Sequence, residues 1–152
     1  MLTAVLALAC SPVLGDLKVP TAKRDDLGEF AVKAGAVTFN NFCVGEGTNH
    51  GATVGPREHR GFNVVTVRGT FRNPSAERLA YTLVVYGVSE GGEVEWTCQL
   101  AGIADREDVG ILDGHIPVLP GTLNKTPTIR VRATVGPVPA TEPQLSPAPA
   151  LR

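Results

Sequence analysis

The sequence predicts an all-β protein, an antiparallel immunoglobulin-like β-sandwich of six to eight strands. Three observations predict this fold class. Several stretches alternate apolar and polar residues, the pattern of a strand with one buried and one solvated face. Gly and Pro number 17 and 12 among the 152 residues, as expected where many turns join short strands. No stretch combines a 3.6-residue apolar period with helix caps.

The strands are expected in five places. Every second residue is apolar or Gly in three stretches, each of which predicts a half-buried strand: Val65–Arg72, Val94–Leu100 and Ile129–Val135. Tyr81–Tyr86 is rich in β-branched and aromatic residues and alternates less cleanly, which favours a central strand. A further strand is expected over Val37–Phe39 and Phe42–Val44, with a bulge at Asn40-Asn41.

Turn residues separate these strands and set the boundaries of the domain. Asn73-Pro74-Ser75, Glu90-Gly91-Gly92 and Leu119-Pro120-Gly121 predict turns. A chain of this length predicts one domain with tails. We expect the sandwich over residues 27–136, preceded by a polar tether over 16–26. Residues 137–152 hold five prolines, which predicts an extended, disordered tail.

Residues 1–15 have the features of a signal peptide or lipoprotein signal. The uncharged run Leu2–Ala9 is far shorter than the roughly 20 residues of a membrane-spanning helix. It suits the apolar region of a signal peptide, with cleavage after Ala9 or Gly15. The segment Leu6–Ser11 resembles a bacterial lipobox, which implies lipidation of Cys10, although Ala7 stands where that pattern prefers Leu. We therefore expect an extracytoplasmic protein: periplasmic, secreted or lipid-anchored. The alternative is a buried first strand of a cytosolic protein.

The cysteines are consistent with export. If Cys10 is removed or lipidated, Cys43 and Cys98 remain, and an even number is typical of an oxidising compartment. Alternate residues of a strand point to the same face, so Cys43 is expected to point inward with Phe39, and Cys98 to point inward with Trp96. We therefore expect a disulfide between Cys43 and Cys98, and the alternative is two separate buried thiols.

The composition and the motifs argue against several classes of function. With 14 basic and 15 acidic residues the net charge is −1, so a strongly basic nucleic-acid binder is excluded and no nucleic-acid partner is expected. No Ser or Cys has a base and an orienting acid near it in sequence, so we expect no catalytic residues and no enzyme activity. Gly45–Thr48 lacks the Lys and the helix of a phosphate-binding loop. No cofactor is expected.

Two clusters could in principle bind a metal, and neither has the spacing of a known motif. His50 and His59 lie near Glu46 and Glu58 in one loop, and four acids follow Leu100: Asp105, Glu107, Asp108 and Asp113. The first cluster lacks zinc-ligand spacing, and the second lacks the calcium-loop spacing and contains Arg106. We therefore expect solvated loops and no metal site.

The segment 45–61 is the predicted binding surface. It is longer than a typical connection and holds five glycines. Long loops on a rigid sandwich often carry recognition residues. Arg57, His59 and Arg60 are the expected binding residues, with Arg suited to carboxylates. The alternative is an insertion without a binding role.

Parts of the chain resemble known families of bacterial envelope proteins. The run from Val65 to Pro74, followed by Tyr81–Val88, Gly91–Val94 and Leu119–Gly121, resembles the FxLYD-type module, although Tyr86 is followed by Gly87 and not by Asp. The stretch from Gly28 to Cys43 is similar to the start of telokin-like, immunoglobulin-like domains. These resemblances imply the fold of an accessory or binding module.

Together these observations predict an exported β-sandwich, with or without a lipid anchor at Cys10, that binds an unknown protein or envelope component and has no catalytic activity. The membrane is expected to be contacted only through that lipid. The alternative is a small periplasmic metal-binding protein, or a secreted enzyme or inhibitor, that uses the 45–61 loop.

Overall fold

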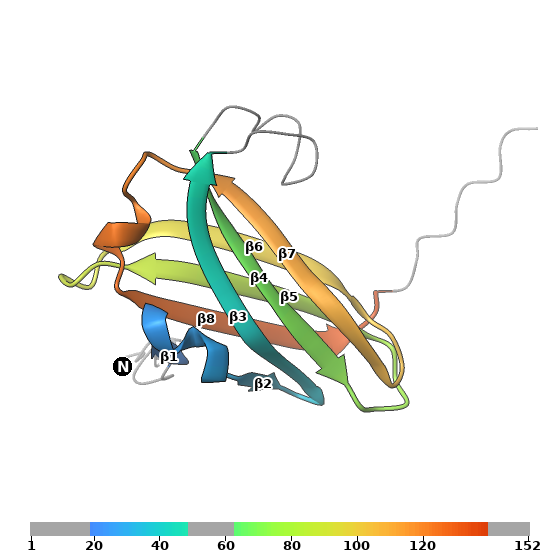
Figure 1. Cartoon of the computed structure of the whole chain (residues 1–152). Helices are drawn as coiled ribbons and strands as arrows, with labels where there is room; N and C mark the ends of the chain where they lie inside the picture. Colours follow the sequence, from blue (N-terminus) through green and yellow to red (C-terminus); the bar gives the residue numbers. More distant parts are fainter. Residues whose placement is uncertain (1–18, 49–62, 140–152) are drawn as a thin grey trace, which may run out of the picture.

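The computed structural model describes residues 19–48 and 63–139. Two four-stranded antiparallel sheets pack face to face, with the strand orders β1-β8-β5-β6 and β2-β3-β4-β7 (Figure 1). The predicted all-β sandwich is confirmed. The elements are β1 (Thr21–Lys23), η1 (Arg24–Glu29), β2 (Val32–Ala34), β3 (Val37–Thr48), β4 (Asn63–Asn73), β5 (Leu79–Val88), β6 (Val94–Ala104), β7 (Asp108–Pro117), η3 (Leu123–Lys125) and β8 (Thr128–Pro137).

The strand pairing interlocks the two sheets. β4 pairs with β7 and β5 pairs with β8, so two consecutive strands each pair with the strand three positions further along. The B–E and C–F pairs of immunoglobulin sandwiches have the same Greek-key relation. The first strand, β1, pairs with β8 and takes the edge position that the last strand occupies in that fold.

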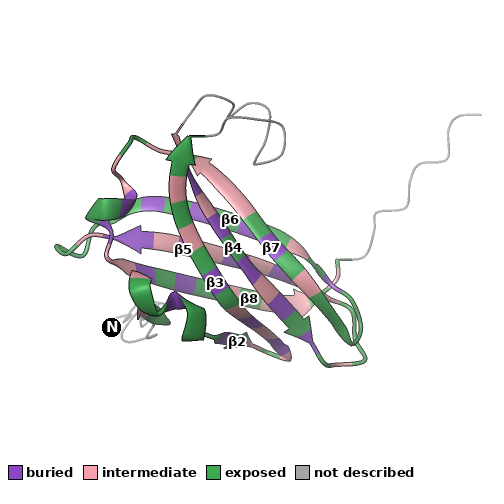
Figure 2. Cartoon of the chain, viewed as in Figure 1, coloured by how far each residue is buried: buried purple, intermediate pink, exposed green. Residues whose placement is uncertain are grey.

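The core lies between the sheets and follows the predicted alternation. Figure 2 shows buried and exposed residues alternating along the long strands. Tyr81 of β5 stacks against two rings of the facing sheet, with ring centroids 5.5 Å from Phe39 and 5.1 Å from Phe71. Such aromatic contacts add to the free energy gained from burying the rings themselves.

Trp96 makes a hydrogen bond in the core, and its indole ring fits there because the residue opposite it is a glycine. Its Nε1 donates to Thr126 Oγ1 at 3.2 Å, and both residues are buried. Gly87 is the register partner of Trp96 on the neighbouring strand. A Cβ atom at Gly87 would overlap the indole ring, so the packing of this strand pair requires glycine there.

The predicted disulfide is absent, and the prediction that Cys43 faces inward is wrong. Both cysteines are free thiols, Cys43 exposed and Cys98 buried. The predicted bulge explains the error, because the register of β3 shifts between Asn40 and Cys43, and Asn41 has a φ of 54°. The extra residue makes Phe42 the next inward side chain after Phe39. Cys43 therefore lies on the outer face of one sheet, while Cys98 lies in the core.

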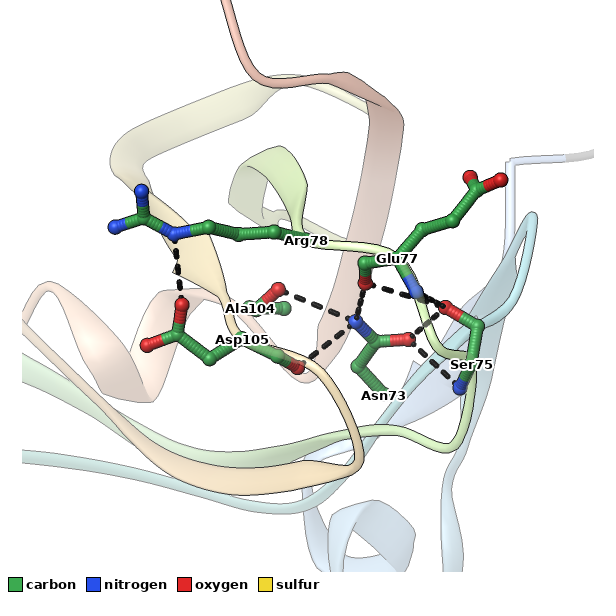
Figure 3. Close-up of polar contacts among 6 residues, drawn as sticks. All are labelled: Asn73, Ser75, Glu77, Arg78, Ala104 and Asp105. Carbon is green, nitrogen blue, oxygen red and sulfur yellow. Dashed lines mark hydrogen bonds and ion pairs between the residues drawn. The ribbon is translucent and has the colours of Figure 1, made fainter.

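Asn73 organises the end of the sandwich where β4 and β6 finish. It is fully buried, and its Nδ2 donates to the carbonyl oxygens of Glu77, Ala104 and Asp105 at 2.7, 3.2 and 2.9 Å (Figure 3). Its Oδ1 accepts from the backbone N–H and the hydroxyl of Ser75 at 3.1 and 2.7 Å. One amide thus connects the β4–β5 and β6–β7 turns, and a buried polar group with all its partners is stable.

The domain begins earlier than predicted. Thr21–Lys23 falls in the expected tether, yet it pairs with β8 as strand β1. The Arg24 side chain also donates to the Leu123 carbonyl at 2.8 Å. The segment was expected as a tether because it is short and polar. Its strand forms through backbone pairing at the sheet edge, which the side chains do not indicate. The predicted signal, residues 1–15, and most of the proline-rich tail lie outside the described residues. Within the described part, no helix has the length and apolarity to cross a membrane.

Candidate functional site

The predicted binding residues Arg57, His59 and Arg60 lie outside the described residues, as does the predicted lipidation site Cys10. The base of the predicted loop is described, and it is more regular than expected. Gly45–Thr48 continues β3 and pairs with Asn63–Thr66 of β4. The strand β3 therefore extends through the first four residues of the predicted loop, to Thr48.

A groove lies on the outer face of the sheet beside this base. It has a volume of about 270 Å³ and is formed by β3 and β4. Gly45 and Gly47 leave it open, because no side chain rises from them opposite Thr66 and Val64. We call it the Arg68 groove. Its lining residues are Cys43, Gly45, Glu46, Gly47, Thr48, Val64, Thr66 and Arg68.

Polar side chains border the groove on the side of β7. Arg68 pairs with Cys43 on one side and with Asp113 on the other. Its Nε donates to Asp113 Oδ1 at 3.4 Å, with the two side chains 54% and 50% exposed. His115 Nε2 lies 3.2 Å from the same carboxylate oxygen, and His115 Nδ1 lies 3.2 Å from Thr66 Oγ1. These contacts fix Asp113 and His115 more firmly than they fix the end of Arg68.

The outer edge of the Arg68 guanidinium has no hydrogen-bond partner among the described residues. Within residues 19–48 and 63–139, its only side-chain hydrogen bond is the long one from Nε. The pair formed by Arg78 and Asp105 is closer, at 2.7 Å. The two Nη atoms of Arg68 present a planar pair of donors, which matches a carboxylate or another planar anion.

Glu46, which also lines the groove, has a structural role. Its carboxylate accepts from the backbone N–H groups of Gly121 and Leu123, each at 2.6 Å, and from Asn63 Nδ2 at 2.7 Å. Burial raises the pKa of Glu46, but these hydrogen bonds and one from the Thr122 backbone favour the charged form, so the net pKa lies below 4.5. Glu46 ties the end of β3 to the turn before η3.

The two thiols differ in reactivity. Burial, together with the charge of Asp113, raises the pKa of Cys98 to about 11. Its thiol is therefore protonated and shielded. Gly114 of β7 leaves the space that Cys98 and Leu100 occupy, since a Cβ there would lie 2.8 Å from Cys98 Sγ. Cys43 is exposed in the groove and is the accessible thiol of the described residues.

The acids after Leu100, which were expected in one solvated loop, are divided between a turn and a strand. Asp105 and Glu107 lie at the turn between β6 and β7, whereas Asp113 lies in the middle of β7 beside Arg68. Of the predicted histidine cluster, only Glu46 is described. No group of three or more His, Cys, Asp or Glu side chains suited to a metal ion occurs in the described part of the chain.

Sequence patterns did not single out Arg68 as a functional residue. Alternation placed it on the solvated face of its strand, but pairing of β4 with β7, 45 residues away, brings it beside Asp113. No local feature of the sequence reveals that pairing. Comparison of the chain with family models, with curated proteins and with solved structures finds no match.

Proposed function

We propose that this protein is an extracytoplasmic, non-catalytic binding module and that the Arg68 groove binds a carboxylate carried by its partner. The observation that carries the proposal is the guanidinium of Arg68, which borders an open groove and contacts Asp113 only through Nε. A charge-assisted, two-pronged hydrogen bond to a carboxylate is among the strongest contacts that a protein surface can make.

The shape of the groove supports a partner that approaches closely. Gly45 and Gly47 form part of its wall, and a Cβ at either position would meet no atom within 4 Å. A partner segment can therefore lie against the backbone of β3. Glu46 holds this wall in place through its bonds to the turn before η3. The groove is thus a preformed site, which lowers the entropic cost of binding.

Binding is tested with N-acetylglycine, a small mimic of a peptide C-terminus, by NMR titration of the labelled full chain. We expect shifts confined to β3, β4 and β7, and roughly tenfold weaker binding in Arg68→Gln, because one charged hydrogen-bonding group is lost. Arg72→Gln is the matched control, since Arg72 lies exposed on the same strand and face. Neutral N-acetylglycinamide should not bind. Equal binding by Arg68→Gln and the parent protein would refute the role of Arg68.

The extracytoplasmic part of the proposal rests on the sequence of residues 1–15 and is tested separately. Intact-mass measurement on protein from the cell envelope should show a chain that starts after Ala9 or Gly15. A mass gain of a diacylglycerol on Cys10 would identify the lipid-anchored form. A full-length chain starting at Met1 and confined to the cytosol would contradict export.

A further inference from the structure

The outer face of the second sheet carries three cations in a line. Arg130 and Arg132 are exposed on β8 and point away from the core. Lys23 of β1 is exposed beside Thr128, two residues before Arg130. Residues two apart on a strand are separated by about 7 Å, which is the spacing of Arg130 and Arg132 along β8. Lys23 continues the row at the level of Thr128, but on the neighbouring strand, about 5 Å to the side.

These cations are not neutralised by their neighbours. Among the described residues, no carboxylate lies within ion-pair distance of any of the three. On the strands of this face the acid is Glu95 of β6, two strands away from β8, which corresponds to about 10 Å. Glu90, in the β5–β6 turn, lines a pocket with Lys125 and Pro127, just before β8 begins. Asp25 and Asp26 follow β1 in η1, which packs against β3 of the opposite sheet. A row of cations without an ion-pair partner among the described residues creates a positive field along β8.

The rest of the face suits a sugar chain. Tyr86 is half-buried and lies between Arg130 on β8 and Thr97 on β6. Its ring offers an apolar surface on which a sugar ring can stack. Several outward positions of β5, β6 and β8 carry hydroxyl or amide groups, which can bond to sugar hydroxyls: Thr82, Thr97, Gln99 and Thr134. Val84, which pairs with Arg132 and Gln99, adds an apolar position to the same face.

We propose that this face binds a linear, carboxylated polysaccharide that lies along β8, with its carboxylates on Arg130 and Arg132. Arginine forks match carboxylates, and the row of cations matches a regularly charged polymer. Single-stranded nucleic acid fits less well, because its binding sites stack successive bases on several aromatic rings, and this face has only Tyr86 among the described residues.

This site is independent of the Arg68 groove, because it lies on the other sheet and faces away from it. Failure of one proposal therefore leaves the other intact. Arg72 provides the matched control again. It is an exposed arginine on the outer face of the opposite sheet, so it shares the net charge effect of a substitution without contributing to the proposed site.

The test is calorimetric titration of the full chain with a hexamer of galacturonic acid at low salt. Because hydrogen bonds to charged groups are strong, Arg130→Gln and Arg132→Gln should each weaken binding about tenfold, and Arg72→Gln should change it less than about twofold. Tyr86→Phe should retain the affinity and Tyr86→Leu should reduce it, because stacking requires the ring and not the hydroxyl. All these side chains are at least partly exposed, and circular dichroism verifies that each variant is folded.

Four results would overturn the proposal. They are no binding of the hexamer, equal binding of a neutral glucose hexamer, tighter binding of a ten-residue thymidine oligonucleotide or of phosphatidylglycerol vesicles, and equal loss of affinity in Arg72→Gln. The third result would assign the face to nucleic acid or to a lipid surface.

Discussion

Gly87 occupies a position at which the core leaves no room for a side chain. The indole of Trp96 fills the space above it, and a Cβ would overlap that ring. Gly87→Ala should therefore displace Trp96 and its hydrogen bond to Thr126, at a cost of about 1–3 kcal/mol. Urea unfolding measures this loss. Gly91→Ala is the control, because a Cβ there meets nothing closer than 3.8 Å, and an equal loss in both variants would contradict the explanation.

Glu46 makes the stability of the protein depend on pH in a defined direction. Its pKa in the folded state lies below 4.5, so its charged form stabilises the fold above pH 4.5, and this contribution is lost as the pH falls through the folded-state pKa. Glu46→Gln should reduce stability by about 1–2 kcal/mol at pH 7, because a charged acceptor is lost. The difference in stability between the parent protein and Glu46→Gln, measured by thermal unfolding, should become smaller as the pH is lowered below 4.5. A difference independent of pH would contradict this role of the carboxylate.

At the scale of elements, Asn73 connects two turns that are distant in sequence. The side-chain amide forms hydrogen bonds with both the β4–β5 turn and the β6–β7 turn (Figure 3). Asn73→Ala would leave buried carbonyl oxygens without donors, which costs about 2–3 kcal/mol. Asn124→Ala, at an exposed residue, should cost almost nothing. Native-state hydrogen exchange should show faster exchange in both turns of Asn73→Ala, and an effect confined to residues 74–78 would contradict the connecting role.

The strands β3, β4, β5, β6 and β8 were predictable from local patterns, and their partners were not. Alternation over Val65–Arg72 and Ile129–Val135 requires only a buried and a solvated face, and both stretches are strands. The pairing of β4 with β7 depends on how the two sheets close over the core, so the position of Asp113 beside Arg68 could not be deduced. The short strand β1 is polar, and it was missed because its pairing is made by the backbone. The strand β7 was expected as a solvated acidic loop, because its acids and its glycines Gly110 and Gly114 hide the alternation that its pairing with β4 makes regular.

The error over Cys43 shows what a bulge does to a prediction based on parity. The sequence Asn40-Asn41 indicated the bulge, and the register of β3 does shift there. The prediction assumed that every second residue from Phe39 to Cys43 points inward. It did not allow for the residue that the bulge adds. Since one extra residue reverses every later side chain on a strand, the bulge that was predicted also excluded the disulfide that was predicted.

The described part of the molecule presents two outer sheet faces with different chemistry. The outer face of β2-β3-β4-β7 holds the Arg68 groove with the exposed thiol of Cys43. The outer face of β1-β8-β5-β6 holds the line of cations formed by Lys23, Arg130 and Arg132. A sandwich with a rigid, well-packed core can position two binding surfaces independently, so the two proposals together predict a protein that binds two partners at once.

Labelling of Cys43 in living cells tests the central claim, extracytoplasmic binding through the Arg68 groove, most directly. Intact cells that make the protein are treated with a membrane-impermeant reductant and then with a membrane-impermeant maleimide. Cys98 serves as the internal control, because it is buried and its pKa is raised to about 11. Peptide mapping then reports which thiol reacted and how fast.

We predict that Cys43 is labelled in intact cells while Cys98 is not. The rate should be slower than in the purified protein, because the partner occupies the groove, and Arg68→Gln should restore the faster rate. Labelling of Cys43 only after the cells are lysed would contradict the extracytoplasmic location. Equal rates in cells and in solution, unchanged by Arg68→Gln, would contradict binding through the groove.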